Sequence, residues 1–255
     1  MRSRLSFLPL LVAVLAIASA CVFGGGDDDD SSSDPGTIVA TPTPFTNDDS
    51  ISPHLEGPAS LYSISQDDLG PGYITDIEGT WVLSSDVYGG TKPFAGTDGP
   101  GMLKGWGYVD GYETGYTPEG RSAAVLNGSY TIKVETHLMK DEAGARELFN
   151  FFKEALGKSV SEPVSASPIG NEFTAWRYID RENGVNGSDI PGEYHQYVFR
   201  RGNLVAAVLT WGAEPFANVN AVYSLAHIID EKALGQVPLV EPTPVATPVA
   251  TAAGN

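Results

Sequence analysis

Two segments that flank the middle of the chain have compositions that cannot build a hydrophobic core, and this confines the fold to the residues between them. Residues 21–56 combine runs of glycine, aspartate and serine with a Thr-Pro repeat, and residues 237–255 again carry proline at short intervals. Such segments bury too little apolar surface to offset the entropy lost when a chain becomes ordered. We therefore predict a disordered acidic tether over 21–56, a single folded domain over 57–236 and a disordered Pro/Thr/Ala tail over 237–255.

The charge balance excludes one large class of partners. The chain has 15 Lys and Arg against 32 Asp and Glu, a formal net charge of −17. A surface this acidic repels nucleic acid, so we predict no nucleic-acid partner. The only cysteine is Cys21, which lies outside the predicted domain. The core of that domain must therefore hold without disulfides.

The first 20 residues are typical of an export signal. Arg2 and Arg4 precede an apolar run from residue 5 to residue 17, which ends in small residues. A run of this length is too short to cross a bilayer, which takes about 20 apolar residues. A charged start, a short apolar run and a small-residue exit indicate a cleaved signal peptide, which we place at residues 1–20.

The end of that segment, Ile17-Ala18-Ser19-Ala20-Cys21, resembles the lipobox of bacterial lipoproteins, although position 18 is usually leucine in that family. The resemblance implies that Cys21 is lipidated, becomes the mature N-terminus and holds the protein on the extracytoplasmic face of a bacterial cell membrane. The alternative is ordinary cleavage after Ala18 or Ala20. A lone thiol without a disulfide partner favours lipidation, and two or three acyl chains on one residue give stable attachment.

Hydrophobic periodicity predicts most elements of the domain. Alternation over 130–138 indicates a half-buried strand, and apolar residues at helical spacing indicate a helix that Asp141 caps and Gly157 ends. Asn218 caps a second such helix. Further strands are expected at 172–180, 194–200 and 204–211, the last two as a hairpin, with short strands at 79–84 and 105–112. We expect long loops over the rest of residues 73–128.

These elements predict an α+β fold. Tight turns between neighbouring strands favour an antiparallel β-sheet, and the two amphipathic helices are expected to pack on one of its faces. Strand then helix, used twice, suggests a pseudo-repeat. We expect five helix residues to be buried against the sheet face that carries Ile132 and Val134. They are Leu148, Phe149, Phe152, Val222 and Ile229.

The element order, together with the phrase Asp68-Leu69-Gly70-Pro71-Gly72-Tyr73 before the sheet, resembles the extracellular α+β domains of bacterial sensor kinases and lipoproteins. It is also similar to the related PsbP and Mog1 domains. The resemblance implies an extracytoplasmic sensor or accessory domain and brings no functional residue with it. The paired cysteines of the kinase sensor domains are absent from this chain.

No motif of catalysis or metal binding is present. The histidines lack metal-ligand spacing, and the sequence contains no Gly-x-Ser-x-Gly elbow or P-loop. We therefore assign no catalytic residue and predict no metal and no cofactor.

The best candidates for ligand binding lie in the aromatic, glycine-rich segment. Tyr112, Glu113 and Tyr116 are expected to be exposed contacts, with Trp106 nearby. The competing interpretation is that such aromatics are core residues of strands. His195 is a further candidate because strand alternation allows it to face a cleft.

Two functions from different classes remain open. The first is a membrane-anchored, surface-displayed lipoprotein with a non-enzymatic ligand-binding or accessory domain, whose partner is a small molecule, a glycan or an envelope protein. The second is a cell-envelope hydrolase with a site built from carboxylates and His195.

Overall fold

The computed structural model describes residues 47–80, 98–182, 184–185 and 188–239. The signal peptide, Cys21, the tether up to residue 46, Trp81 and the tail from residue 240 lie outside the described residues. Most of the strand expected at 79–84 lies outside them too. The predictions made for these segments therefore remain predictions.

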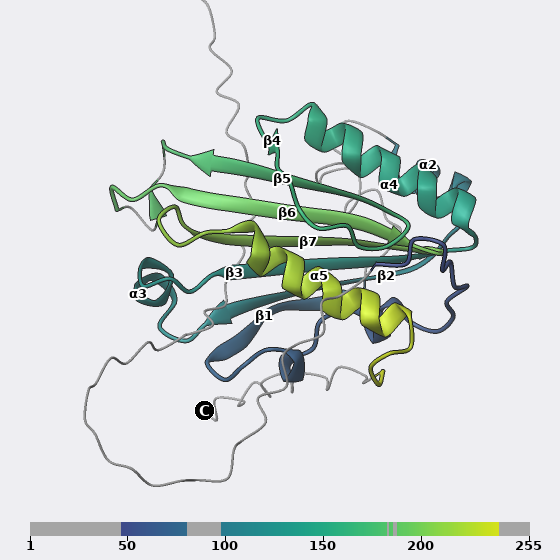
Figure 1. Ribbon diagram of the computed structural model, residues 1–255, viewed down its shortest axis with the longest axis horizontal. Helices are drawn as coiled ribbons and strands as arrows, with labels where there is room; N and C mark the ends of the chain where they lie inside the picture. The colour runs from purple at the N-terminus through teal and green to yellow at the C-terminus, as the bar shows by residue number, and fades with distance from the viewer. Residues whose placement is uncertain (1–46, 81–97, 183, 186–187, 240–255) are drawn as a thin grey trace, which may run out of the picture.

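The described chain builds a seven-stranded antiparallel sheet in the order β1-β2-β3-β7-β6-β5-β4 (Figure 1). This confirms the predicted α+β class with an antiparallel sheet. In chain order the strands are β1 Tyr73–Thr80, β2 Tyr108–Pro118, β3 Thr131–Met139, β4 Glu162–Pro163, β5 Glu172–Asp180, β6 Gly192–Arg201 and β7 Leu204–Ala213.

Two long helices and several short ones accompany the sheet. The long helices begin at the predicted caps, because the Asp141 side chain accepts from the Gly144 N–H at 2.9 Å and the Asn218 side chain accepts from the Asn220 N–H at 3.1 Å. None of the described helices has the length and apolar character needed to cross a membrane. The helices are η1 Ala59–Tyr62, η2 Gln66–Asp68, α2 Gly99–Gly105, α3 Arg121–Leu126, α4 Glu142–Gly157 and α5 Val219–Ala233.

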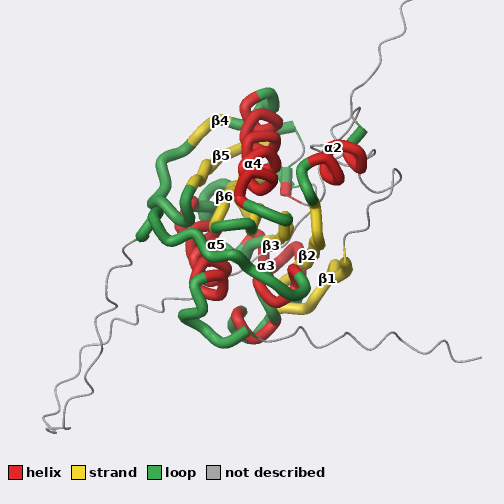
Figure 2. Tube along the Cα trace, turned by 90° about the vertical axis from the view of Figure 1, so that its right-hand side faces the viewer, coloured by secondary structure: helices red, strands yellow, loops and turns green. Residues whose placement is uncertain are grey.

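The two long helices pack on opposite faces of the sheet, so the prediction that they share one face is wrong (Figure 2). Val222 and Ile229 of α5 are buried with Ile132 and Val134, as expected. Leu148, Phe149 and Phe152 of α4 are buried as well, but with Val198, Val205 and Ala207 on the other face. We call the two sides the α5 face and the α4 face.

The sequence of β7 explains this arrangement. Leu204 to Val208 form a continuous apolar run, and all five residues are buried, alternately under α5 and under α4. Such a run is typical of a strand that is covered on both sides.

The folded unit begins before residue 57, because residues 47–56 lie against the turn between β6 and β7. Arg201, which is fully buried, donates to the carbonyl oxygens of Asp48 and Ile51 at 2.6 and 2.9 Å. The Asn203 side chain exchanges two hydrogen bonds with the backbone of Leu55. The predicted tether boundary at residue 56 is therefore about ten residues too late.

The segment expected to be mostly long loops contains a long strand instead. β2 runs from Tyr108 to Pro118 and pairs with both β1 and β3. Its glycines suggested turns, but Gly111 has a packing role: a Cβ there would lie 2.0 Å from the Tyr108 hydroxyl oxygen. Glycine at this position makes room for a neighbouring ring within the sheet.

Candidate functional site

The α4 face of the sheet is organised in rows of side chains that run across the strands. Each row contains one residue of β7 and its partner on β3. The two rows nearest the β6–β7 turn pair Val205 with His137 and Ala207 with Glu135. The two outer rows pair Leu209 with Lys133 and Trp211 with Thr131. α4 covers the first two rows, where Val205 and Ala207 pack against it and the Phe152 ring lies 5.8 Å from the His137 ring. The outer two rows lie beyond the helix.

Six partly exposed side chains from β5, β6 and β7 occupy these outer rows, and we call this surface the open face. Figure 1 shows the strands extending to the left, away from α4. The rings of Tyr178, Tyr194 and Trp211 form a continuous row, with centroid separations of 5.8 Å at each step. The six residues of the open face are Trp176, Tyr178, Tyr194, Gln196, Leu209 and Trp211.

A glycine lies beside each tryptophan of the open face. A Cβ at Gly192 would lie 2.4 Å from Nε1 of Trp211, so only glycine allows the indole to extend over β6. A Cβ at Gly157, the last residue of α4, would touch the Trp176 ring at 3.6 Å. The Trp176 indole also donates to the Thr174 hydroxyl at 2.7 Å. Trp176 therefore marks the border between the covered and the open halves of the sheet.

A cluster of charged side chains continues the same face onto β3 and β2. Lys133 lies 2.7 Å from a carboxylate oxygen of Glu113 and 2.7 Å from one of Glu135. Glu135 also lies 3.6 Å from Nε2 of His137, which is buried. We call these four residues the charge cluster. It holds two carboxylates around one ammonium group on a largely desolvated surface.

Burial and pairing shift the pKa values of this cluster in different directions. Burial raises the pKa of Glu113, and the nearby Glu135 carboxylate adds to the rise. For Glu135 burial acts in the same sense, but the charge of Lys133 and contact with His137 prevail and lower its pKa to about 2. Burial tends to lower the pKa of Lys133, and the two carboxylates raise it above the ordinary value. Lys133 and Glu135 therefore stay ionised at neutral pH.

His195 lies on the α5 face, away from the charge cluster. Its side chain is buried, and Nε2 lies 3.3 Å from Glu193, which in turn lies 3.7 Å from Arg177. Burial, assisted by the charge of Arg177, lowers the pKa of His195 to about 4. His195 is therefore neutral at neutral pH, and with 4% of its surface exposed it does not line an open cleft.

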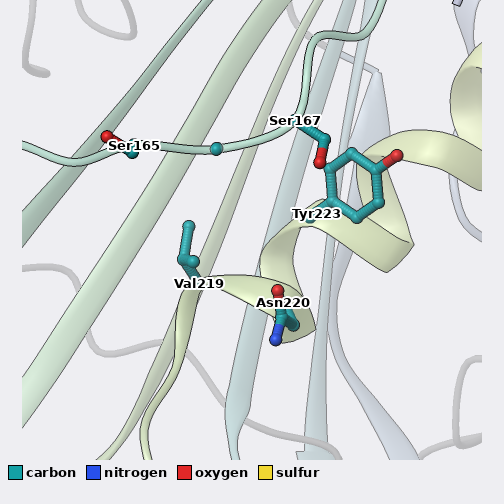
Figure 3. A pocket seen from close by; sticks show the side chains of 6 residues that line it. Ser165, Ser167, Val219, Asn220 and Tyr223 are labelled. Carbon is teal, nitrogen blue, oxygen red and sulfur yellow. The ribbon is translucent and has the colours of Figure 1, made fainter.

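A shallow pocket of about 310 Å³ also lies on the α5 face, between α5 and the segment that follows β4 (Figure 3). Its lining consists of hydroxyl, amide and small apolar groups without a formal charge. None of the residues predicted as ligand contacts lines it. The lining residues are Ser165, Ala166, Ser167, Val219, Asn220 and Tyr223.

The structure separates the ligand contacts that the sequence had grouped together. Tyr112 and Tyr116 are buried under the α5 side of the sheet, where the Tyr116 hydroxyl donates to the Ile64 carbonyl at 2.7 Å. Their predicted exposure is wrong, because strand alternation turns both rings into the core. Glu113, between them, faces the opposite way and joins the charge cluster. Trp106 is half-buried at the end of α2, with its ring 5.6 Å from Phe151 of α4.

The open face was not predicted from the sequence. Trp176 and Tyr178 alternate along a strand that was correctly predicted, and Tyr194 and Trp211 belong to the predicted hairpin. Aromatic residues on the same side of three adjacent strands were the available signal. Detecting it requires the strand order, since β5, β6 and β7 must be neighbours before their rings form one row.

The fold and the site together define an α+β domain with one helix on each face of an antiparallel sheet and a partly uncovered aromatic surface. Among the described residues, no group of His, Cys, Asp and Glu side chains could hold a metal ion. No family model matches the chain, and no curated protein matches it.

A solved structure does share the fold. It is the crystal structure of the extracellular domain of PknH from Mycobacterium tuberculosis, with a TM-score of 0.50 and 12% sequence identity. The match covers 72% of this chain and 100% of that chain. At this identity the likeness concerns the fold alone. It supports the expected likeness in fold to the extracellular domains of bacterial sensor kinases, while the likeness to PsbP and Mog1 stays a prediction.

Proposed function

We propose that this protein is a lipoprotein anchored through Cys21, and that its extracytoplasmic α+β domain binds a ligand as a non-enzymatic sensor or accessory module. The observation that carries the proposal is the open face. α4 covers only half of its side of the sheet, and the remaining half carries four partly exposed aromatic rings beside a desolvated charge cluster. Aromatic surfaces with a few placed polar groups are typical of binding sites.

Two further findings support the proposal. The fold is similar to that of the extracellular domain of PknH, so a domain of this shape is suited to work outside a membrane. The lipobox-like sequence ending at Cys21 supplies the means of attachment. Because both ends of the domain are flanked by segments of low hydrophobicity, we propose that the domain is displayed at a distance from the membrane surface.

The alternative, a hydrolase built on His195 and carboxylates, has one observation in its favour, the 3.3 Å contact between His195 and Glu193. A general base must reach the substrate, and this imidazole is buried. The pair fits a structural role better than a catalytic one. We therefore propose a binding function for the protein.

The anchor is tested by Cys21→Ser, with Ser19→Ala as the matched control. We expect the wild type and the control to fractionate with membranes and to carry the mass of attached acyl chains at Cys21. We expect Cys21→Ser to lose the acyl mass and to leave the membrane fraction. Equal membrane retention of Cys21→Ser would disprove lipid anchoring.

The binding function is tested by a thermal-shift screen of the lipid-free chain, residues 21–255 with Cys21→Ser. A ligand at 100 times its Kd stabilises the native state by about 2.7 kcal/mol, which raises the Tm of a domain of this size by roughly 5–10 °C. A ligand of the open face should give a smaller shift with Tyr194→Ser and an unchanged shift with Tyr223→Ser, a tyrosine of the α5 face. Equal loss of the shift in both variants would contradict the proposed site.

A further inference from the structure

We propose that the open face binds an organic cation, a substituted ammonium group that lies against the rings of Tyr194 and Trp211 with Asp180 as its counter-charge. The inference rests on the proposed binding function and names the class of ligand. It follows from the geometry of the rings and from the charges that surround them.

The rings provide the first part of the argument. The faces of tryptophan and tyrosine attract cations through the negative potential of their π systems, most strongly where water is partly excluded. Tyr178, Tyr194 and Trp211 come from three adjacent strands, and both ring contacts are tilted, at 30° and 35°, instead of flat. The three rings therefore form one aromatic surface across the three strands. All three rings are partly buried, which lowers the water content around them.

The carboxylate of Asp180 provides the second part. Asp180 follows Tyr178 by two residues on β5, so strand alternation places it on the same face, and it pairs in register with Gly192. One of its oxygens accepts the Glu182 N–H at 3.1 Å. After burial, which is the larger cause, the charge of Asp180 contributes to the raised pKa of both Tyr178 and Tyr194. The negative charge of Asp180 therefore acts on the two tyrosines of the ring row.

The surrounding charges disfavour an anionic ligand. Lys133 is held between Glu113 and Glu135, and exposed Arg181 pairs with Glu214 at 2.8 Å. These two cations are thus already neutralised by carboxylates. The chain as a whole has a net charge of −17, which attracts cations over longer distances. Ring faces, a local carboxylate and the overall field all favour the same sign of ligand.

The test uses choline as the probe and the lipid-free chain, residues 21–255 with Cys21→Ser. The NMR signals of the indole N–H groups of Trp176 and Trp211 report on the open face, and that of Trp106 reports on a remote site. The neutral carbon isostere of choline, dimethylbutanol, is the matched control ligand, and maltose represents neutral glycans. We expect choline to shift the Trp211 signal saturably, with a Kd at least about fivefold lower than that of the isostere. We expect weaker binding at higher salt.

Three variants locate the cation. Tyr194→Leu should raise the choline Kd about fivefold, and Asp180→Asn about threefold, as expected for loss of a partly desolvated cation–π contact and of a screened charge. Tyr223→Leu, the same change on the α5 face, should leave it within about twofold. Tm values of all variants show whether the fold is retained.

The outcomes separate this inference from the proposed function. If the isostere binds as tightly as choline, the inference of a cationic ligand is wrong while the proposed binding function stands. The same conclusion follows if maltose shifts the Trp211 signal and choline does not. If none of the three probes shifts Trp176 or Trp211, the cation inference is again overturned, and the thermal-shift screen decides the binding function independently. A choline response confined to Trp106 would overturn the location.

Discussion

The buried Arg201 offers the sharpest test of how the domain is held together. Its guanidinium group donates to both carboxylate oxygens of Asp230 in α5, at 2.7 and 2.8 Å, and both side chains are fully buried. It also donates to the backbone of Asp48 and Ile51 and to the side chain of Asn47. One side chain therefore connects the β6–β7 turn, α5 and the segment that precedes η1.

Replacing Arg201 with methionine keeps much of the volume and removes all five hydrogen bonds. The main cost is the Asp230 carboxylate, which is left buried without a counter-charge, and breaking a buried pair in this way costs about 3–5 kcal/mol. For a domain of this size, 1 kcal/mol lowers the Tm by about 2–4 °C. We therefore expect Arg201→Met to melt about 6–20 °C below the wild type.

Two comparisons isolate the cause. Arg201→Met combined with Asp230→Leu removes the orphaned charge, so the double variant should regain most of the lost free energy of unfolding. Arg181→Met removes an exposed arginine from its pair with Glu214 and should cost less than about 1 kcal/mol. Denaturant unfolding measures all of them. Limited proteolysis of the native state should cut within residues 47–58 only in variants that lack Arg201.

Two results would refute this reasoning. A loss below about 1 kcal/mol in Arg201→Met would mean that the carboxylate is relieved by water or by protonation, so the pair does not hold the fold together. A double variant no more stable than the single one would assign the loss to packing instead of charge.

Three further changes test other parts of the structure. Phe152→Ala should cost about 3–5 kcal/mol in denaturant unfolding because its ring is buried under α4, and a cost no larger than that of Phe216→Ala, which is exposed, would contradict the packing. Lowering the pH from about 6.5 to about 4 should remove stability through His195 at up to about 1.4 kcal/mol per pH unit, because the unfolded chain binds a proton at His195 that the folded protein, with a pKa of about 4, does not. His195→Gln should lessen the slope of stability against pH in that interval, and an identical slope would show that His195 does not contribute. Gly192→Ala should displace the Trp211 indole and change its fluorescence without global unfolding, since a Cβ would lie 2.4 Å from Nε1, and an unchanged Trp211 environment would contradict the proposed contact.

The sequence predicted the elements that have strong periodicity and clear ends. The strand at 172–180 has the predicted bounds, and the caps Asp141 and Asn218 begin the two long helices as expected. These features depend on local chemistry, on alternation and on side chains that accept from free N–H groups. Interactions within a few residues are enough to establish them.

The errors concern features that only tertiary structure establishes. The glycines of β2 suggested loops, because the need of Gly111 to clear the Tyr108 ring exists only inside the sheet. The polar character of Glu135 and His137 suggested that their side of β3 faces solvent, but both side chains are buried beside α4. Pairing of Glu135 with Lys133 and His137 offsets the cost of burying these polar groups. The open face was missed for the same reason, because its rings meet only when β5, β6 and β7 lie side by side.

The strand order has a consequence for how the protein reaches its native state. The central ladder joins β3 to β7, whose paired residues lie between 66 and 80 positions apart in the chain. Within each half of the sheet, β1 to β3 and β4 to β7, the paired strands are consecutive in the chain, but the apolar residues of β7 meet β3 only after the two halves dock. The conformational entropy of these long loops is lost before the contacts between β3 and β7 can compensate for it, and this slows folding. On the proposed route of export through the signal peptide, this delay keeps the chain unfolded while it crosses, because the sheet cannot close until nearly all of the domain has emerged.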